Sequence, residues 1–424
     1  MSNSELARIF IATEQSSPLA QNTAIDNAGI VATPEMCLKE RPLEGKKLCV
    51  IVTASVTLSA LYRGQFDFLI NEGMQVTAVS APGADLEEIE KLGVRVEPIA
   101  MEREPRPTRD LMSLYRLWRF LRRERFDIVH VSTPKAGFLG AVAARLACQP
   151  CIVFTLRGRT YENLSGLKRG LFAGLDRTTC SIAKLVIPIC RELGDAVIRE
   201  GICRREKLRF VGKGSSNGIE ASRFHRDAEA EATATDLRKQ LGIDNQDIVV
   251  LFVGRIRREK GVNELVEAMK PLLNHYPHLH MVMVGSPESS DPINSETEVE
   301  IKSNDRIHEL GWLPNPERAF WTADIVAMPS YREGFGNVAL EAGAAGLPVV
   351  GFDIMGLREA IEDGESGILV PLRDTQALQR ALEQLIIAPD LRMSLGTQGC
   401  KRVHDHFRQQ IIWNGLAELY SQLA

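Results

Sequence analysis

The sequence predicts an α/β protein with two doubly wound domains in series. Three observations lead to this prediction. The chain has 424 residues, which is more than one hydrophobic core usually holds. Short apolar runs rich in β-branched residues alternate with helical patterns, as they do in parallel sheets covered by helices. The alternation stops at the polar stretch 224–245 and then starts again.

The first predicted domain spans residues 46–215 and begins with the apolar strand at 46–53. Further buried strands are predicted at 75–80, 128–131, 151–155 and 185–188. Helical patterns lie between them, for example at 109–125 and 137–147. Residues 1–45 mix Ser, Thr, Asn, Gln and Pro without sustained periodicity, so we expect a poorly ordered tail there.

The second predicted domain spans residues 216–400 and repeats the strand and helix alternation. Its strands are predicted at 248–253, 280–284, 306–310, 324–328 and 348–352. The closing segment 401–424 carries apolar residues at helical spacing, and we expect it to pack back on the first domain as an amphipathic helix. A ligand cleft is expected between the carboxyl ends of the two sets of strands.

Composition excludes several classes of protein. Apolar residues make up 44% of the chain and charged residues 25%, which is ordinary for a globular protein. No apolar run reaches the roughly 18 residues of a transmembrane helix. Residues 1–45 lack the pattern of a secretory signal, so we expect a cytoplasmic protein. The eight cysteines are scattered through apolar segments and are interpreted as buried thiols.

Two basic residues follow the first strand of the second domain. Gly254 lets the backbone turn there, and Arg255 and Lys260 come directly afterwards. A guanidinium that forks onto one phosphate, with an ammonium beside the next, suits a diphosphate. A solvated basic loop is the alternative. The diphosphate is favoured because a second anion-binding element is predicted at the far end of the same sheet.

That second element is a helix start between two glutamates. Residues 334–338 are predicted to open a helix, and the free amides at a helix N-terminus bind anions. Glu341, about one turn into the helix, can accept two hydrogen bonds from a ribose diol. Glu333, on the other side of the diphosphate, would meet the hydroxyl groups of a sugar, although a surface helix cap is the alternative for it. The order of these groups predicts a nucleotide-sugar site.

These motifs resemble those of the retaining family 4 glycosyltransferases of GT-B fold. The matching stretches are 254–255, 260–261, 333–342, 346–350, 356 and 364–370. Within that family the chain is most similar to bacterial capsule, exopolysaccharide and O-antigen enzymes, through residues 127–137, 154–158 and 214–219. The resemblance covers roughly residues 46–424. It implies two Rossmann-like domains that face each other across a cleft.

The resemblance also implies an activity and its residues. The implied reaction moves a sugar, with retention, from a nucleotide sugar, expected to be a UDP sugar, to a polyprenyl-diphosphate-linked saccharide in bacterial surface polysaccharide synthesis. Arg255, Lys260 and Glu333 are the implied catalytic residues, acting by positioning and charge stabilisation. The loop with Trp312 and Leu313 is implied to read the nucleobase. The donor-binding set is Gly254, Arg255, Lys260, Trp312, Leu313, Glu333, Gly334, Phe335, Gly336, Asn337, Val338 and Glu341.

One position departs from the family pattern. Many members carry a histidine two residues after the position of His130, where this chain has Ser132. His130 itself lies in an apolar strand and is interpreted as a core histidine, so no general base is assigned. Ser132, Lys135 and Arg157 are the candidate acceptor contacts. Because no Asp-x-Asp triplet occurs, we expect no cofactor and no divalent metal, with Arg, Lys and helix amides neutralising the diphosphate.

The first domain is basic and the second is acidic. Residues 46–215 hold 28 Lys and Arg against 18 Asp and Glu, net +10, whereas residues 216–424 hold 20 against 31, net −11. A basic helical stretch suggests peripheral contact with the anionic inner face of the plasma membrane. An ordinary helix with a solvated basic face is the alternative. The stretch carries arginines at 103, 106, 109, 116, 119, 122, 123 and 125 around Leu111, Leu114, Tyr115, Leu117, Trp118 and Phe120.

Three other functions are considered. A nucleotide-sugar 2-epimerase shares the two-domain scaffold but needs carboxylates and histidines for elimination at the sugar, which Ser132 argues against. A non-catalytic nucleotide-sugar-binding protein is disfavoured by the intact Arg255, Lys260, Glu333 and Glu341. Nucleic-acid binding is disfavoured because the arginines lack an RNA-binding or helix-turn-helix pattern.

Overall fold

The computed structural model describes residues 42–102, 104–162 and 164–423, which belong to one compact unit, Arg41–Ala424. The tail predicted at 1–45 lies outside the described residues except for 42–45. Within the described part of the chain, two six-stranded sheets are formed, and all of their strand pairs are parallel. The α/β class and the doubly wound character predicted from the sequence are therefore confirmed.

The first sheet has the strand order β3-β2-β1-β4-β5-β6. Its strands are β1 (Lys47–Ile51), β2 (Gln75–Ser80), β3 (Arg95–Pro98), β4 (Ile128–Ser132), β5 (Ile152–Leu156) and β6 (Leu185–Pro188). The order reverses direction between β1 and β4, and in such sheets ligands bind beyond the carboxyl ends of the strands near this point. Apart from the edge strand β3, the strands are almost wholly buried, which explains their continuous apolar runs.

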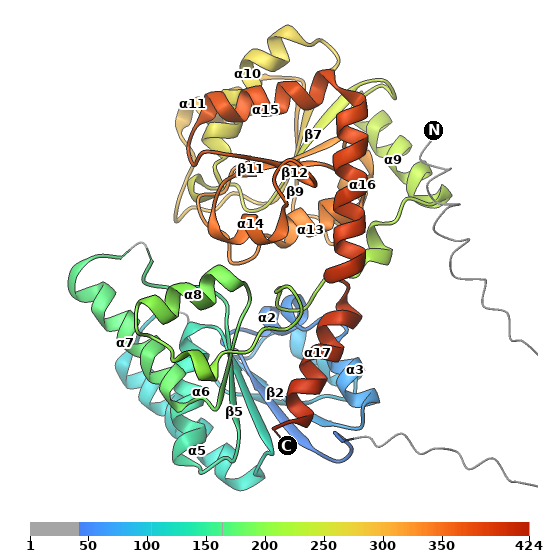
Figure 1. Cartoon of the computed structure of the whole chain (residues 1–424). Helices are drawn as coiled ribbons and strands as arrows, with labels where there is room; N and C mark the ends of the chain where they lie inside the picture. Colours follow the sequence, from blue (N-terminus) through green and yellow to red (C-terminus); the bar gives the residue numbers. More distant parts are fainter. Residues whose placement is uncertain (1–41, 103, 163, 424) are drawn as a thin grey trace, which may run out of the picture. The chain divides into compact units, whose positions relative to one another are not determined.

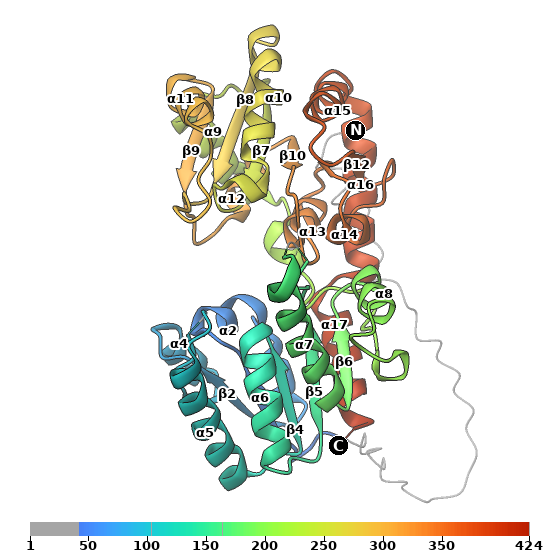
Figure 2. The same ribbon diagram turned by 90° about the vertical axis from the view of Figure 1, so that its left-hand side faces the viewer.

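Helices cover both faces of the first sheet (Figures 1 and 2). Cys49, Val129 and Val131 face the core that α5, α6 and α7 complete, whereas Leu48 and Val50 face a second core on the opposite side. This split follows from the alternation of side chains along a strand. The helices are α2 (Ser55–Leu61), α3 (Gln65–Asn71), α4 (Asp85–Lys91), α5 (Pro107–Glu124), α6 (Pro134–Leu146), α7 (Gly166–Ile182) and α8 (Arg191–Arg199).

The second sheet has the strand order β12-β11-β10-β7-β8-β9. Its strands are β7 (Ile248–Val253), β8 (Leu279–Val284), β9 (Ile307–Gly311), β10 (Ile325–Met328), β11 (Val349–Phe352) and β12 (Gly367–Val370). Its helices are α9 (Ala228–Gln240), α10 (Val262–His275), α11 (Ser295–Ser303), α12 (Glu317–Thr322), α13 (Asn337–Ala344), α14 (Met355–Ala360), α15 (Thr375–Ile387) and α16 (Pro389–His406). The last helix of the chain, α17 (Gln409–Ser421), packs on the first sheet. Short 3-10 helices occur at η1 (Arg205–Lys207), η2 (Ala221–Phe224) and η3 (Arg258–Lys260).

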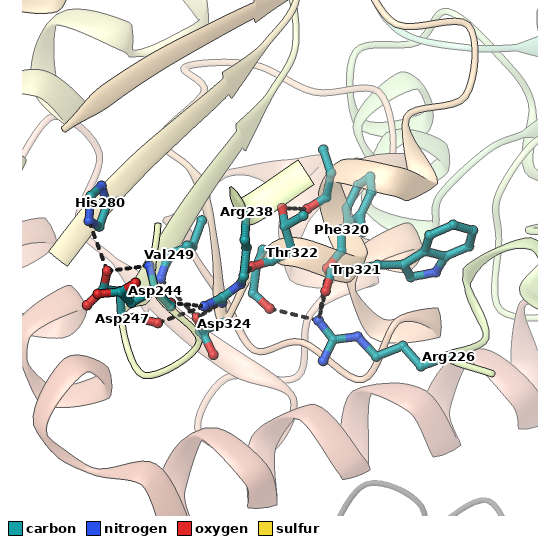
Figure 3. Close-up of polar contacts among 12 residues, drawn as sticks. Arg226, Arg238, Asp244, Asp247, Val249, His280, Phe320, Trp321, Thr322 and Asp324 are labelled. Carbon is teal, nitrogen blue, oxygen red and sulfur yellow. Dashed lines mark hydrogen bonds and ion pairs between the residues drawn. The ribbon is translucent and has the colours of Figure 1, made fainter. Parts of the chain in front are cut away.

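A polar network fixes α9 against the second sheet (Figure 3). Arg238 donates to the carbonyl oxygen of Thr322 at 2.7 Å and pairs with Asp324 at 2.9 Å. The same carboxylate oxygen of Asp324, Oδ2, also accepts a hydrogen bond from the amide of Val249 in β7, at 2.9 Å. Arg226 donates to the carbonyl oxygen of Ala323 at 3.1 Å. The two arginines thus satisfy backbone carbonyls that the end of α12 leaves open.

The closing segment differs from the single helix predicted at 401–424. The chain runs in α16 as far as His406, bends at Phe407 and Arg408, and continues as α17. The bend arises because Ile219 crosses here, bonding through its amide to the carbonyl of Phe407 at 2.7 Å and through its carbonyl to the amide of Gln409 at 3.1 Å. Helix α17 then packs beside α3 and adds Ile412, Leu416 and Tyr420 to a core of the first sheet.

Two strands lacked a clear signal in the sequence, β3 and β12. Both lie at sheet edges and both have partly exposed residues, so neither forms a continuous apolar run. Among the described residues, no helix combines the length and hydropathy needed to cross a membrane.

Candidate active site

A cavity of about 310 Å³ lies beyond the carboxyl ends of strands from both sheets. The first sheet contributes the segment after β5, including Arg157 and Arg159. The second sheet contributes Arg255 and Lys260 after β7, and Glu333 after β10. The structure therefore brings together the three residues that the sequence singled out as catalytic, and it places Arg157 with them.

Two cations enter the cavity from the loop after β7. Gly254 has φ +155°, which suits the turn at the end of the strand. Arg255 is half-exposed and pairs with Glu288 at 2.6 Å. The Lys260 ammonium is more buried and pairs with Glu333 at 2.5 Å between Nζ and Oε1. The residue predicted to bind phosphate, Lys260, and the residue predicted to bind the sugar, Glu333, are therefore ion-paired with each other.

Gly261 fixes the position of Lys260. Its φ is +70°, and a Cβ built there would lie 1.8 Å from the carbonyl oxygen of Pro329. A side chain is therefore excluded by sterics as well as by backbone conformation. Because Pro329 follows β10, this close approach joins the β7 loop to the segment that leads to Glu333.

The second anion-binding element also forms. Gly336 has φ +79° and is the N-cap residue of α13, so the amides of Asn337 and Val338 begin the helix without intrahelical partners. Phe335 is buried and packs edge-on against Phe407, with ring centroids 5.5 Å apart. It anchors the turn, and its side chain does not line the cavity.

Glu341 lies on α13, and its environment is unfavourable for a charge. Burial raises its pKa to about 7, with a further rise from nearby Glu317 and an opposing effect from Arg223. Arg223 and Glu317 pair with each other at 2.8 Å. Within the described residues, no hydrogen bond to the Glu341 carboxyl is formed. In the predicted base-reading loop after β9, the side chain of Trp312 is 72% exposed and Leu313 is partly buried.

The three predicted acceptor contacts have different surroundings. Arg157 lines the cavity, donates to the Ser132 hydroxyl at 2.6 Å and lies over the ring of Tyr62 at 5.6 Å. Ser132 is fully buried and supports Arg157. Lys135 is not brought to the cavity, because Asp110 on α5 pairs with its ammonium at 2.6 Å.

His130 is a core histidine, as its apolar surroundings in the sequence suggested. It is 2% exposed, contacts Thr155 Oγ1 through Nε2 at 2.6 Å, and contacts the Tyr420 hydroxyl through Nδ1. Burial, with a smaller contribution from Arg157, lowers its pKa to about 3. The neutral imidazole therefore ties α17 to β4.

Two family models match the chain. The model for glycosyl transferases group 1 matches residues 233–402, and that for the glycosyl transferase 4-like domain matches residues 63–214. The capsular polysaccharide biosynthesis glycosyltransferase CapM of Staphylococcus aureus is 30% identical over 379 residues, which cover 89% of this chain and 98% of that protein. This chain belongs to the group 1 glycosyltransferases.

Other relatives agree with this assignment. The glycosyltransferase is 27% identical over 296 residues to the UDP-Gal:alpha-D-GlcNAc-diphosphoundecaprenol alpha-1,3-galactosyltransferase of Escherichia coli, covering 69% of this chain and 74% of that one. A crystal structure of the Anabaena protein HepE in complex with UDP and glucose has a TM-score of 0.73 at 21% identity, covering 89% and 99% of the two chains. The predicted GT-B fold is confirmed.

The glycosyltransferase site also contains residues that sequence reasoning missed. Asp176 of α7 and Arg159 line the cavity beside Arg157. Asp176 lies on the buried face of its helix with Thr179 and Cys180, and no local motif marks it in the sequence. Among the described residues, no group of three or more His, Cys, Asp or Glu side chains is arranged to hold a metal ion.

Proposed function

We propose that the protein is a retaining glycosyltransferase that moves a sugar from a UDP sugar to a polyprenyl-diphosphate-linked saccharide in bacterial surface polysaccharide synthesis. The observation that carries this proposal is the meeting of Arg255, Lys260 and Glu333 in one cavity that Arg157 enters from the other sheet. The S. aureus and E. coli relatives, whose names include capsular polysaccharide and a diphosphoundecaprenol acceptor, support the class of product and acceptor.

The donor is proposed to bind along the second sheet. Its diphosphate would lie between Arg255 and Lys260 and the first amides of α13, where charge-assisted hydrogen bonds and the helix N-terminus favour an anion. A phosphate would compete with Glu333 for the Lys260 ammonium, and the freed carboxylate would then accept hydrogen bonds from the donor sugar. Glu341 would receive the ribose hydroxyl groups, and the loop with Trp312 and Leu313 would contact the base.

Catalysis is proposed to need no cofactor or divalent metal. As the bond to the sugar breaks, negative charge grows on the departing diphosphate, and Arg255 and Lys260 stabilise that charge from fixed positions. The departing phosphate would accept the proton of the acceptor hydroxyl on the same face of the sugar, and the anomeric configuration would then be retained. The protein supplies orientation of the two substrates.

The acceptor is proposed to approach from the first sheet, with Arg157 as a contact held by Ser132. Helix α5 is proposed to lie on the anionic inner face of the plasma membrane. Its side chains Leu111, Met112 and Tyr115 are 67%, 53% and 52% exposed. Leu117 and Phe120 of the same basic stretch are buried in the core and do not belong to this surface. Exposed apolar residues among arginines suit the interface of an anionic bilayer.

Product analysis tests the proposed function. The protein is incubated with a panel of nucleotide sugars and a lipid-diphosphate-linked glycan, and the products are examined by mass spectrometry and by NMR of the new anomeric centre. We expect transfer from a UDP sugar with retention. Epimerisation of the donor without transfer would instead establish the 2-epimerase, and donor binding without turnover would establish a non-catalytic binding protein.

A further inference from the structure

Four carboxylates line the cavity, and one of them, Asp176, has no ion-pair partner among the described residues. They are Glu162, Asp176, Glu259 and Glu333. Glu162, Glu259 and Glu333 are each ion-paired with an arginine or lysine within 3.2 Å. Asp176 forms no hydrogen bond or ion pair with any residue that the structure describes. It is also the most buried of the four, at 5% exposure.

The surroundings of Asp176 come from its place on α7. The helix presents Arg177 and Thr178 to solvent and turns Asp176, Thr179 and Cys180 inward. Burial raises the pKa of Asp176 to about 7. A buried carboxyl without a partner lowers the stability of a protein. A buried carboxyl group without a hydrogen-bond partner is a candidate for binding a ligand that donates the hydrogen bond.

The position of Asp176 indicates what that ligand is. The cavity that it lines has Arg255, Lys260 and Glu333 in the part contributed by the second sheet, where the donor is proposed to bind. The volume of about 310 Å³ is at the lower end of small-molecule sites, which suits a terminal sugar ring. A carboxylate offers acceptor positions alone, so its partner must be a donor such as a hydroxyl group.

We infer that Asp176 binds the acceptor saccharide, its carboxylate accepting a hydrogen bond from a sugar hydroxyl and holding that sugar toward the donor at Lys260 and Glu333. This inference rests on the proposed function, because it assigns the acceptor half of the same cavity. Asp176 therefore determines which saccharide is accepted. The nucleotide is bound without it.

The test compares Asp176→Asn with the wild-type protein and with Asp195→Asn. Asn keeps the shape of Asp but removes its charge. Asp195 is an exposed aspartate on α8 that does not line the cavity, so it reports the effect of removing one charge from this half of the chain. Three quantities are measured: the Kd for UDP, kcat/KM for a polyprenyl-diphosphate-linked N-acetylglucosaminyl acceptor at saturating donor, and the melting temperature at about pH 8.

Asp176→Asn is expected to lower kcat/KM for the acceptor about 10-fold to 100-fold, as loss of a hydrogen bond to a charged group does. Its Kd for UDP should stay within about twofold of wild type, and its melting temperature should be equal or higher because no buried charge remains. Asp195→Asn should match wild type in all three measurements.

Unchanged acceptor kcat/KM in Asp176→Asn would overturn the inference. A lower melting temperature would also overturn it, because the carboxylate would then be a paired structural group. If the wild-type protein uses a saccharide acceptor without a lipid diphosphate, the proposed acceptor class fails, and the same comparison on that saccharide still decides the role of Asp176. If the wild-type protein transfers to no saccharide at all, both proposals fail. If the wild-type protein transfers the sugar but acceptor kcat/KM is unchanged in Asp176→Asn, only the role of Asp176 fails and the proposed function stands.

Discussion

Replacing Glu341 by Gln should stabilise the free protein at alkaline pH and weaken its binding of UDP. Glu341 lies on α13 and is partly buried, and burial raises its pKa from an ordinary value of 4.5 to about 7. The carboxylate is therefore harder to ionise in the folded protein than in the unfolded chain. Gln has nearly the same shape and carries no charge, so it removes this conflict.

The sign and size of the effect follow from linkage between folding and proton binding. Below the unfolded pKa, Glu341 is protonated in both states and the two proteins should be equally stable. As the pH rises through the interval up to about 7, the unfolded chain loses its proton first, and the wild-type protein loses stability relative to the variant. One pKa unit corresponds to about 1.4 kcal/mol, so the full shift would give about 3 kcal/mol. Partial exposure of the side chain reduces this to about 2 kcal/mol.

The assay is thermal and urea denaturation of both proteins at about pH 5 and about pH 8.5. We expect a small difference at the lower pH, and at the higher pH a melting temperature raised by about 4 °C in the variant. Glu317→Gln is the matched control, because Glu317 pairs with Arg223 at 2.8 Å and its loss should not stabilise the protein. In the same samples, Glu341→Gln should bind UDP about tenfold more weakly.

Two outcomes would refute this reasoning. An equal shift in melting temperature at both pH values would mean that ionisation of Glu341 does not oppose folding. A loss of stability in Glu341→Gln at about pH 8.5 would mean that the carboxylate has a favourable partner. Unchanged affinity for UDP would leave the stability argument intact but would remove Glu341 from the proposed ribose site.

Three further predictions concern the phosphate loop and the membrane surface. Lys260→Met should raise the Kd for UDP about 10-fold to 100-fold, because a charge-assisted contact with phosphate is lost. Isothermal titration calorimetry measures this Kd, and an unchanged value would contradict the proposed phosphate-binding role of Lys260. Gly261→Ala should lower the free energy of unfolding by about 3 kcal/mol or more, because the residue has a positive φ and its Cβ would collide with a carbonyl oxygen. Gly346→Ala is the control, since Gly346 has φ +72° but open space around it, and it should lower the free energy of unfolding by about 1–2 kcal/mol. Equal losses of the two variants in urea denaturation would contradict the steric argument. Leu111→Ser should reduce sedimentation of the protein with phosphatidylglycerol vesicles at low salt. Ile387→Ser, which also replaces an exposed side chain, should not reduce it. Vesicle binding that does not depend on lipid charge or salt would rule out α5 as a membrane-binding surface.

Sequence reasoning worked where the signal was local. Most of the strands are continuous apolar runs, and β2, β6 and β7 occupy the residues expected for them. The donor motifs could also be found in this way, because a glycine turn, two nearby cations and a helix start are properties of short segments. The positive φ values at Gly254, Gly261 and Gly336 agree with those expectations.

Sequence reasoning failed where tertiary contacts decide the outcome. Lys135 looked available for an acceptor, but its charge is taken up by Asp110, which lies on another helix. The helix expected at 401–424 is interrupted because Ile219 bonds across it. Asp176 was overlooked because nothing in its local sequence says that Arg159, Lys260 and Arg332 pair with other carboxylates, or that Arg157 is held by Ser132.

The return of α17 to the first sheet has a consequence for how the chain is made. Ile412, Leu416 and Tyr420 fill the same core as Leu48 of β1 and Ile128 of β4. A ribosome releases β1 early and α17 late, so this core must wait for most of the chain before it is complete, although α2, α3 and α4 already cover part of it. Truncation before residue 409 would expose the part of this core that α17 covers, and adding α17 as a separate peptide is the natural way to complete it.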